Sequence, residues 1–185
     1  MPSPGMRVLA VFALAVVAAL VSSPNGATGS AALVERRDAL EAGVVRELNR
    51  VRAAAGLQPL RVAPSLRTAA RGHSRAMLRH GFFGHDSHDG TTFSSRIRRH
   101  YTTRGWATWS VGETLLASQG GAIDAGSVVE SWLDSPPHRK VILSPTWRDA
   151  GIGVLFSSPA PAVFGGTEAV VITADRQGLT ELTGA

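Results

Sequence analysis

Two histidines and a glutamate are the residues of this chain whose types and settings best suit chemistry. His85 lies in FFGHDSHDG, Glu113 in VGETLL and His138 in SWLDSPPHRKVIL, each at the border of an apolar segment. The chain has no cysteine, which excludes thiol nucleophiles and thiolate metal ligands. Two imidazoles and a carboxylate can bind zinc or another divalent cation. They equally suit general acid/base work, or a hydrogen-bonded cluster that ties helices to a sheet.

Only the fold can bring these three residues together, because their separations of 28 and 25 residues match no local metal motif. Glu113 stands between a glycine and an apolar pair, so we expect it to be at least half buried and to need a partner such as an imidazole. The two phenylalanines before His85 should dock its loop onto the core. Ser135 before the two prolines is typical of a helix cap, and no G-x-S-x-G elbow supports a nucleophilic role.

The other four histidines have simpler interpretations. His88, three residues after His85, is an alternative metal ligand in HDSH. It lies, however, in a loop that ends in Asp-Gly and should be exposed to solvent. His73 falls on the buried side of a predicted helix and reads as an interior histidine. His80 and His100 close predicted helices, where an imidazolium favours the helix dipole.

Apolar periodicity predicts the elements that must position these residues. Helices are expected over 33–55, 65–80, 92–100 and 125–133, with a brief strand before Gly112 and two strands over 149–158 and 168–175. Helices come first and strands last, which indicates an α+β fold with an antiparallel sheet covered by helices.

The N-terminus predicts export. Arg7 is followed by an apolar run from Val8 to Val21 and then by small residues, as in a signal peptide over residues 1–32; an uncleaved anchor helix is the alternative. We therefore expect a secreted or cell-envelope protein with no stable membrane span after cleavage. The net charge of +5 comes from dispersed arginines, which favours a solvated surface over a nucleic-acid site.

Longer motifs carry a family resemblance. The segment from ELNRVRAAAGL through FFGHDS, then GET, then WLDSPPHRKVIL and GIGV resembles the bacterial branch of the CAP superfamily, also called the SCP-like extracellular domain family. Cysteine-rich secretory and plant pathogenesis-related proteins belong to the same group. The resemblance implies a lead-in over 33–46, the domain over 47–176 and a tail over 177–185.

The resemblance implies an α–β–α sandwich with a small antiparallel sheet between helices and a central cleft. In the family that cleft carries two histidines and usually two acids, which hold a divalent metal in some members. By position these are His85, His138 and Glu113, and the second acid falls near Asp134 or Ser135. The family's disulfides are absent.

Three functions follow as hypotheses. The first is an extracellular domain that binds a protein, peptide or lipid ligand through the His/Glu cleft, with or without a cation such as zinc, and that is not an enzyme. The second is a metal-dependent peptidase that uses the same residues. The third is a lipid or sterol carrier, by analogy with other family members. The sequence leaves the ligand and the oligomeric state open.

Overall fold

The computed structural model describes residues 25–101, 106–120, 123–158, 160–166 and 169–181. In chain order the elements are α1 (Asn25–Ala54), β1 (Arg61–Val62), α2 (Pro64–His80), α3 (Phe93–Arg98), β2 (Trp106–Gln119), α4 (Ala125–Asp134), α5 (Pro136–Ile142), β3 (Asp149–Ser157), the short 3-10 helix η1 (Ala162–Phe164) and β4 (Ala169–Glu181).

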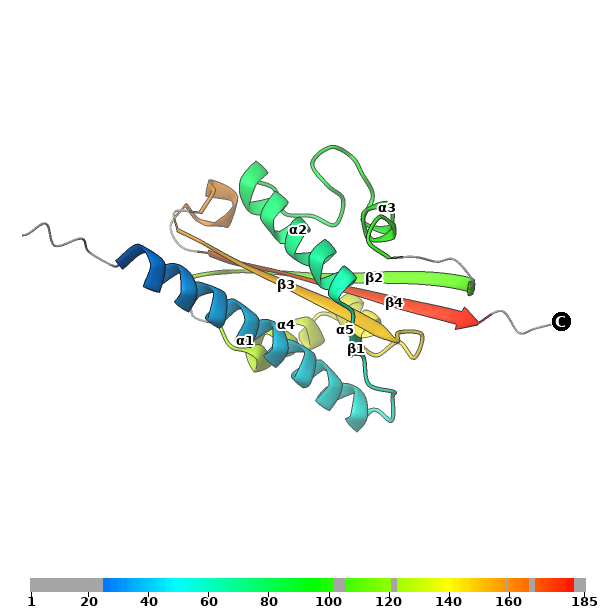
Figure 1. Cartoon of the computed structure of the whole chain (residues 1–185). Coiled ribbons are helices and arrows are strands. Elements are labelled where there is room, and N and C mark those ends of the chain that lie inside the picture. The colour runs from blue at the N-terminus through cyan, green and yellow to red at the C-terminus, as the bar shows by residue number, and fades with distance from the viewer. Residues whose placement is uncertain (1–24, 102–105, 121–122, 159, 167–168, 182–185) are drawn as a thin grey trace, which may run out of the picture.

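Helices cover both faces of one sheet, so the molecule has three layers (Figure 1). Helices α1, α4 and α5 lie on one face, and α2 and α3 lie on the other. The strand order is β1-β3-β4-β2, with β4 antiparallel to both of its neighbours. The predicted α+β sandwich is confirmed. The two-residue β1 is an addition to it and pairs parallel with the start of β3.

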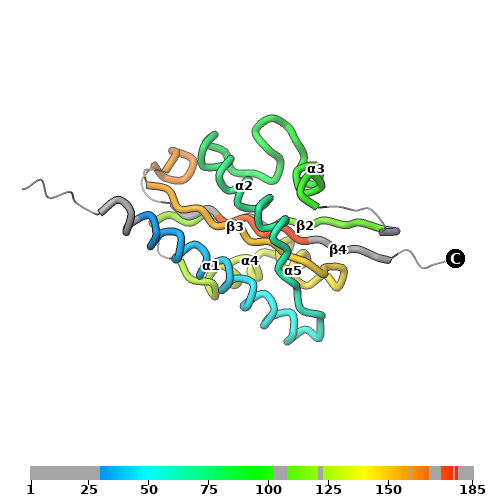
Figure 2. Tube along the Cα trace, in the orientation of Figure 1, coloured from blue at the N-terminus to red at the C-terminus, as the bar shows by residue number. Residues whose placement is uncertain are grey.

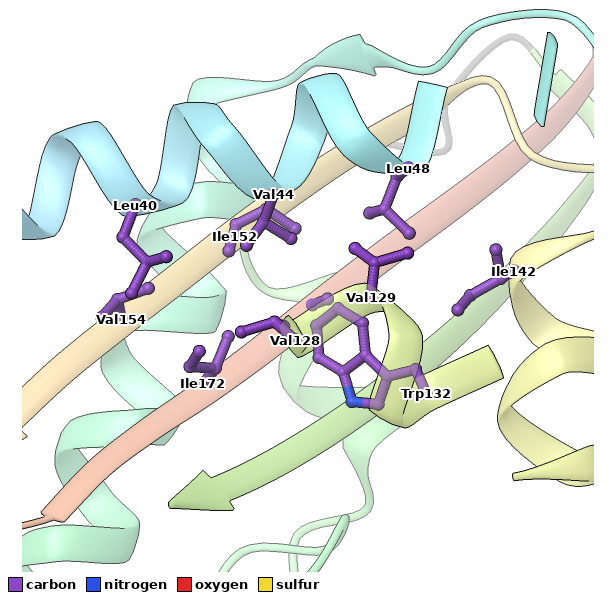
Figure 3. Packing of buried hydrophobic residues seen from close by; sticks show 11 residues of the cluster. Leu40, Val44, Leu48, Val128, Val129, Trp132, Ile142, Ile152, Val154 and Ile172 are labelled. Atoms are coloured by element: carbon purple, nitrogen blue, oxygen red, sulfur yellow. The ribbon is translucent and has the colours of Figure 1, made fainter. Parts of the chain in front are cut away.

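The main core fills the space between the sheet and the layer of α1 and α4. Leu40, Val44 and Leu48 point from α1 toward β3 and β4, and Trp132 of α4 lies beneath them (Figure 3). The Trp132 indole donates a hydrogen bond to the carbonyl of Leu115 at 2.9 Å, which satisfies its polar atom. The spacing of the α1 residues is the apolar periodicity that predicts this helix.

On the opposite face, α2 approaches β3 so closely that only glycine fits between them. A Cβ on Gly151 would overlap the backbone of Leu66 and Arg67, and one on Gly153 would overlap the backbone of Arg71. The alternation in DAGIGV therefore places glycine toward α2, while Ile152 packs toward α1. The tube view shows α1 and α2 on the two sides of these strands (Figure 2).

Three elements are longer than the sequence predicts. Strand β4 continues to Glu181, six residues past its predicted end at residue 175. Helix α1 begins at Asn25, within the predicted signal peptide, whose first 24 residues lie outside the described part. Strand β2 continues through Gly112 to Gln119 instead of stopping before it. Glycine serves here because the Trp147 ring packs against the strand, within 2.7 Å of where a Cβ would stand. No helix in the described ranges is long and apolar enough to cross a membrane.

Candidate functional site

The side chains of His85 and Glu113 meet as the sequence predicts. Nδ1 of His85 lies 2.8 Å from Oε1 of Glu113. The Glu113 side chain is only 1% exposed, whereas that of His85 is 49% exposed. The imidazole is therefore fixed from behind by a buried carboxylate and presents its other edge to solvent. When Glu113 is ionised, Nδ1 of a neutral His85 carries the proton and Nε2 keeps its lone pair.

Arg96 of α3 closes a ring of hydrogen bonds around this pair. Its Nη2 donates to Oε2 of Glu113, and its Nη1 donates to the backbone carbonyl of His85 at 2.8 Å. Both the main chain and the side chain of His85 are thus held by the same three-residue ring. Such closed hydrogen-bond networks fix orientation more firmly than separate bonds do.

The loop that carries His85 is anchored on both sides of the histidine. Nε2 of His73, on α2, lies 2.8 Å from the carbonyl of Gly84, and the Phe82 ring meets the His73 ring edge-on at 5.8 Å. After the histidine, the Asp86 carboxylate accepts the backbone N–H of Phe93 at 3.0 Å. Burial lowers the pKa of His73 to about 4, so it is neutral and donates to Gly84.

Burial also shifts the two members of the His85–Glu113 pair. Desolvation raises the pKa of Glu113 to about 7, although the Arg96 guanidinium opposes the shift. The pKa of His85 is lowered by burial and then by the positive charge of Arg96. Near neutral pH the site therefore combines a neutral imidazole with a carboxyl group that can hold or release a proton.

A second buried acid lies directly across the sheet from Glu113. Asp175 on β4 is the register partner of Glu113 on β2, and Oδ1 of Asp175 is 4.0 Å from Nη2 of Arg96. With both acids ionised, neither oxygen of Asp175 has a hydrogen-bond partner among the described residues. A proton on either carboxyl would let the two groups hydrogen-bond to each other. Burial, then the Glu113 charge, raises the pKa of Asp175 well above its usual range.

His138 approaches from the other helical layer. It lies on α5, whose Ile142 packs into the core beside α1 and α4. Burial lowers its pKa first, and then the charge of His85, so the two rings are close enough to interact electrostatically. Because β2 is an edge strand, the imidazoles come from opposite faces toward that edge. His138 forms no hydrogen bond to His85 or Glu113 among the described residues.

The short helix α5 forms as the diproline predicts, with Pro136 and Pro137 in its first turn. Ser135 occupies the N-cap position but makes no side-chain capping hydrogen bond there. Asp134, the sequence's candidate for the second acid, is an exposed residue at the end of α4. Within the described part of the chain, its side chain makes no hydrogen bond or ion pair.

The alternative ligand His88 is occupied elsewhere. Its ring stacks on that of His80 at 3.6 Å with an interplanar angle of 13°, which joins the loop to the end of α2. Two stacked imidazoles point their nitrogens outward from parallel planes and do not converge on one ion.

Glu113, predicted as a metal ligand, has a hydrogen-bond partner at each of its two oxygens, His85 at Oε1 and Arg96 at Oε2. No group of three His, Asp or Glu side chains within the described ranges could hold a metal ion. What fits a cation is the arrangement common in metalloproteins, where a carboxylate orients a histidine whose other nitrogen binds the metal. Here Nε2 of His85 and the His138 ring would be the donors, with Glu113 behind.

The described hollows of the surface lie away from this site. Two hollows, of about 110 and 140 Å³, lie between α1 and β3, and a third of about 330 Å³ is lined by Arg61, Trp147 and their neighbours. None of these three is lined by His85, Glu113 or His138.

Residues 45–167 match the model of the cysteine-rich secretory protein (CAP) family. This chain belongs to the CAP family. The Bacillus subtilis protein YkwD is 31% identical to it over 119 residues, which are 64% of this chain and 44% of YkwD. The CAP domain thus spans less than half the length of that relative.

Two solved structures share the CAP fold with this chain. One is an extracellular protein of Bacillus anthracis that contains an SCP domain, with a TM-score of 0.61, 21% identity, and coverage of 80% of this chain and 43% of that one. The other is an outer surface protein of Borrelia burgdorferi, with a TM-score of 0.55, 18% identity, and coverage of 75% and 90%. At these identities the likeness establishes the fold of the CAP domain and nothing finer.

Sequence reasoning missed Arg96 and Asp175. Arg96 is one of three arginines in SRIRRH and looks like part of a basic surface, although it is only 8% exposed. For Asp175 the sequence does hold a signal. This residue lies two residues after Thr173 in an apolar strand, so both side chains point to the same face of the sheet, and this spacing predicts a buried polar group rather than a strand end.

Proposed function

We propose that this CAP domain works outside the cell as a binding module whose recognition site is the β2 edge bearing His85 and His138. The two structural neighbours are described as an extracellular and an outer surface protein, which supports a place in the cell envelope or beyond. The predicted signal peptide supports the same location.

One observation carries the proposal: His85 is held from behind yet half exposed in front. Glu113 and Arg96 fix its ring and its main chain, while nothing in the ring of contacts uses Nε2. An imidazole held only for stability would be covered. A fixed, neutral imidazole at the surface is instead prepared to accept a donor hydrogen or a divalent cation.

Zn²⁺ is the first probe for this site. Titration calorimetry of the protein should show one site that is lost in His85→Ala and in His138→Ala. His100→Ala is the matched control, because this histidine is exposed at the end of α3. Equal binding in all three variants would show that the zinc is held elsewhere, and no binding in the native protein would remove the cation from the proposal.

The same titration has a defined pH dependence. A cation needs neutral imidazoles, and the pKa values of His85 and His138 both lie below the usual 6.5. Proton competition at the imidazoles should therefore begin below pH 6.5 in Glu113→Gln, in which no carboxyl with a pKa near 7 titrates behind His85. An affinity of that variant that already declines from pH 8 downward would contradict the lowered pKa values.

A hydrolase is the second candidate, because a carboxylate with a pKa near 7 beside an imidazole is a general acid/base arrangement. In this reading His85 takes a proton at Nε2, and Glu113 stabilises the imidazolium. Incubation with a peptide library should then give cleavage that Glu113→Gln abolishes. Absence of cleavage at high protein concentration would leave the binding role alone.

A further inference from the structure

We propose that Asp175 is the second acid of this site, a positioning residue that acts on His85 through Arg96 and Glu113. This inference rests on the proposed function, since it concerns the same imidazole. It assigns to the last strand the acid that the sequence places near Asp134.

The position of Asp175 is the first support. Residues that face each other on antiparallel strands project from the same face of the sheet, so Asp175 and Glu113 share one layer. Both side chains are essentially inaccessible, at 0% and 1% exposed. Two carboxyl groups enclosed in one layer need compensating cations, and Arg96 is the nearest described one.

Comparison with the other buried acids shows that Asp175 is not there to complete a structural network. Glu41 accepts three hydrogen bonds, two from Arg71 and one from the backbone of Val154. Asp149 also accepts three, two from Arg61 and one from Tyr101. Among the described residues, Asp175 accepts no hydrogen bond from an arginine, a hydroxyl or a backbone N–H. Its close side-chain partner is the carboxyl group of Glu113, which is itself part of the site. A buried acid held for stability is normally saturated by donors, so this pairing calls for another reason.

Besides Glu113, Asp175 approaches Arg96, and this contact also leads to His85. Its Oδ1 is 4.0 Å from Nη2 of Arg96, the same nitrogen that donates to Glu113. The planar guanidinium of Arg96 has five N–H donors. Its Nη2 can therefore face two carboxyl groups while its Nη1 donates to a carbonyl. Asp175 thus fixes the plane of Arg96, Arg96 fixes Glu113, and Glu113 fixes the ring of His85.

Substitution of the two candidate acids separates the alternatives. Asp175→Asn removes the charge and keeps the shape, and Asp134→Asn is the matched control. At pH 8, ¹⁵N NMR of the native protein should show His85 as one tautomer with the proton on Nδ1. Asp175→Asn should give a mixture of both tautomers and about tenfold weaker Zn²⁺ binding. A loss of this size is usual when a residue that supports a metal ligand is substituted. Asp134→Asn should change neither.

A folded Asp175→Asn variant with an unchanged His85 tautomer would overturn the proposal. If that variant does not fold, Arg96→Lys decides, because an ammonium group keeps the charge but cannot serve both acids and the His85 carbonyl. The same mixture of tautomers is expected there, and an unchanged tautomer would overturn the route through Arg96 that the proposal requires. Failure of the native protein to bind zinc would refute the cation role alone, since the tautomer is read without metal.

Discussion

Arg52 and Arg176 are both fully buried, yet they are satisfied very differently. Arg52 donates to the backbone carbonyls of Gln58, Ile142, Ser144 and Trp147 at 2.8–3.5 Å, an arrangement termed here the Arg52 staple. Arg176 donates only through Nη1, to Thr114 and Ala174, and its Nε and Nη2 lack partners among the described residues.

The difference extends to the surroundings of Arg176. Glu113, Arg96, Asp175 and Arg176, termed here the Glu113 cluster, include several buried polar atoms without a hydrogen bond in the described part of the chain. A structural polar group is saturated because an unmet donor costs stability. A site tolerates unmet groups where its chemistry needs them. The saturation of the staple is typical of a structural group, and the unmet atoms of the cluster agree with the binding role proposed for His85.

The largest expected effect tests the staple. Arg52→Met leaves buried carbonyls unpaired and should lower the free energy of unfolding by at least about 3 kcal/mol. Urea denaturation measures the loss. Arg50→Met is the control, because this arginine is exposed and pairs, among the described residues, with Glu47 alone, so its loss should stay below about 0.5 kcal/mol. Equal losses in the two variants would contradict the role of the staple.

The second effect appears as a pH dependence in the cluster. The pKa of Glu113 is raised from 4.5 to about 7, so the folded state keeps its proton longer than the unfolded state. Ionisation of Glu113 therefore destabilises the fold increasingly as pH rises from 4.5 to 7, by about 3 kcal/mol in all. Relative to Glu113→Gln, the native protein should lose this amount over that window and match the variant below it.

The control for Glu113 is Glu47, whose pKa is lowered by its hydrogen bond with Arg50. Its ionisation favours the folded state, so the Glu47→Gln comparison should have the opposite sign. Urea denaturation at pH 4, 5.5 and 7.5 distinguishes the two. A parallel pH profile for native protein and Glu113→Gln would show that burial does not hold the Glu113 proton.

A smaller effect is expected at Arg176. Replacement by Met removes two hydrogen bonds but also removes two unmet donors, so the net loss should be no more than about 1–2 kcal/mol. Measured by urea denaturation at pH 4, where the acids hold protons, it should be clearly smaller than the loss in Arg52→Met. A loss as large as that of Arg52→Met would erase the distinction between the two regions.

The smallest effect belongs to Asp134. Asp134→Asn should change the free energy of unfolding by less than about 0.5 kcal/mol, because an exposed side chain that bonds to none of the described residues contributes little. Thermal or urea unfolding suffices to measure it. A larger loss would show that Asp134 has a structural contact in solution.

The sequence predicts the parts of the fold that are set by local pattern. The periodic apolar residues of α1 and α2 and the alternation in β3 identify those elements. The sequence underestimates the length of β2, because a glycine inside a strand usually indicates a break. Gly112 is instead needed to leave room for the Trp147 ring, and only the fold reveals that contact. Two-residue β1 is beyond any pattern, since its pairing with β3 is entirely long-range.

The candidate site likewise contains residues that the sequence reveals and residues that it does not. His85 and Glu113 are recognisable because each is a polar residue at an apolar border, and the structure joins them. Arg96 and Asp175 are not, because their significance lies in cross-strand register and in contacts 11 to 17 residues away along the chain. The local sequence pattern predicts which side chains are fixed in place. The residues that contact them are brought there by the topology of the fold, which the pattern does not give.

The strand order has a consequence for how this protein is made. β4, the last strand synthesised, lies between β3 and β2, so neither neighbour can pair with it until residues 169–181 are available. When the chain is synthesised from its N-terminus, the pairings of β4 with β3 and β2 can form only at the end. Pairing between strands so distant in sequence slows folding. The export proposed for this protein would benefit from that delay, because a chain crosses a membrane more easily before its sheet has formed.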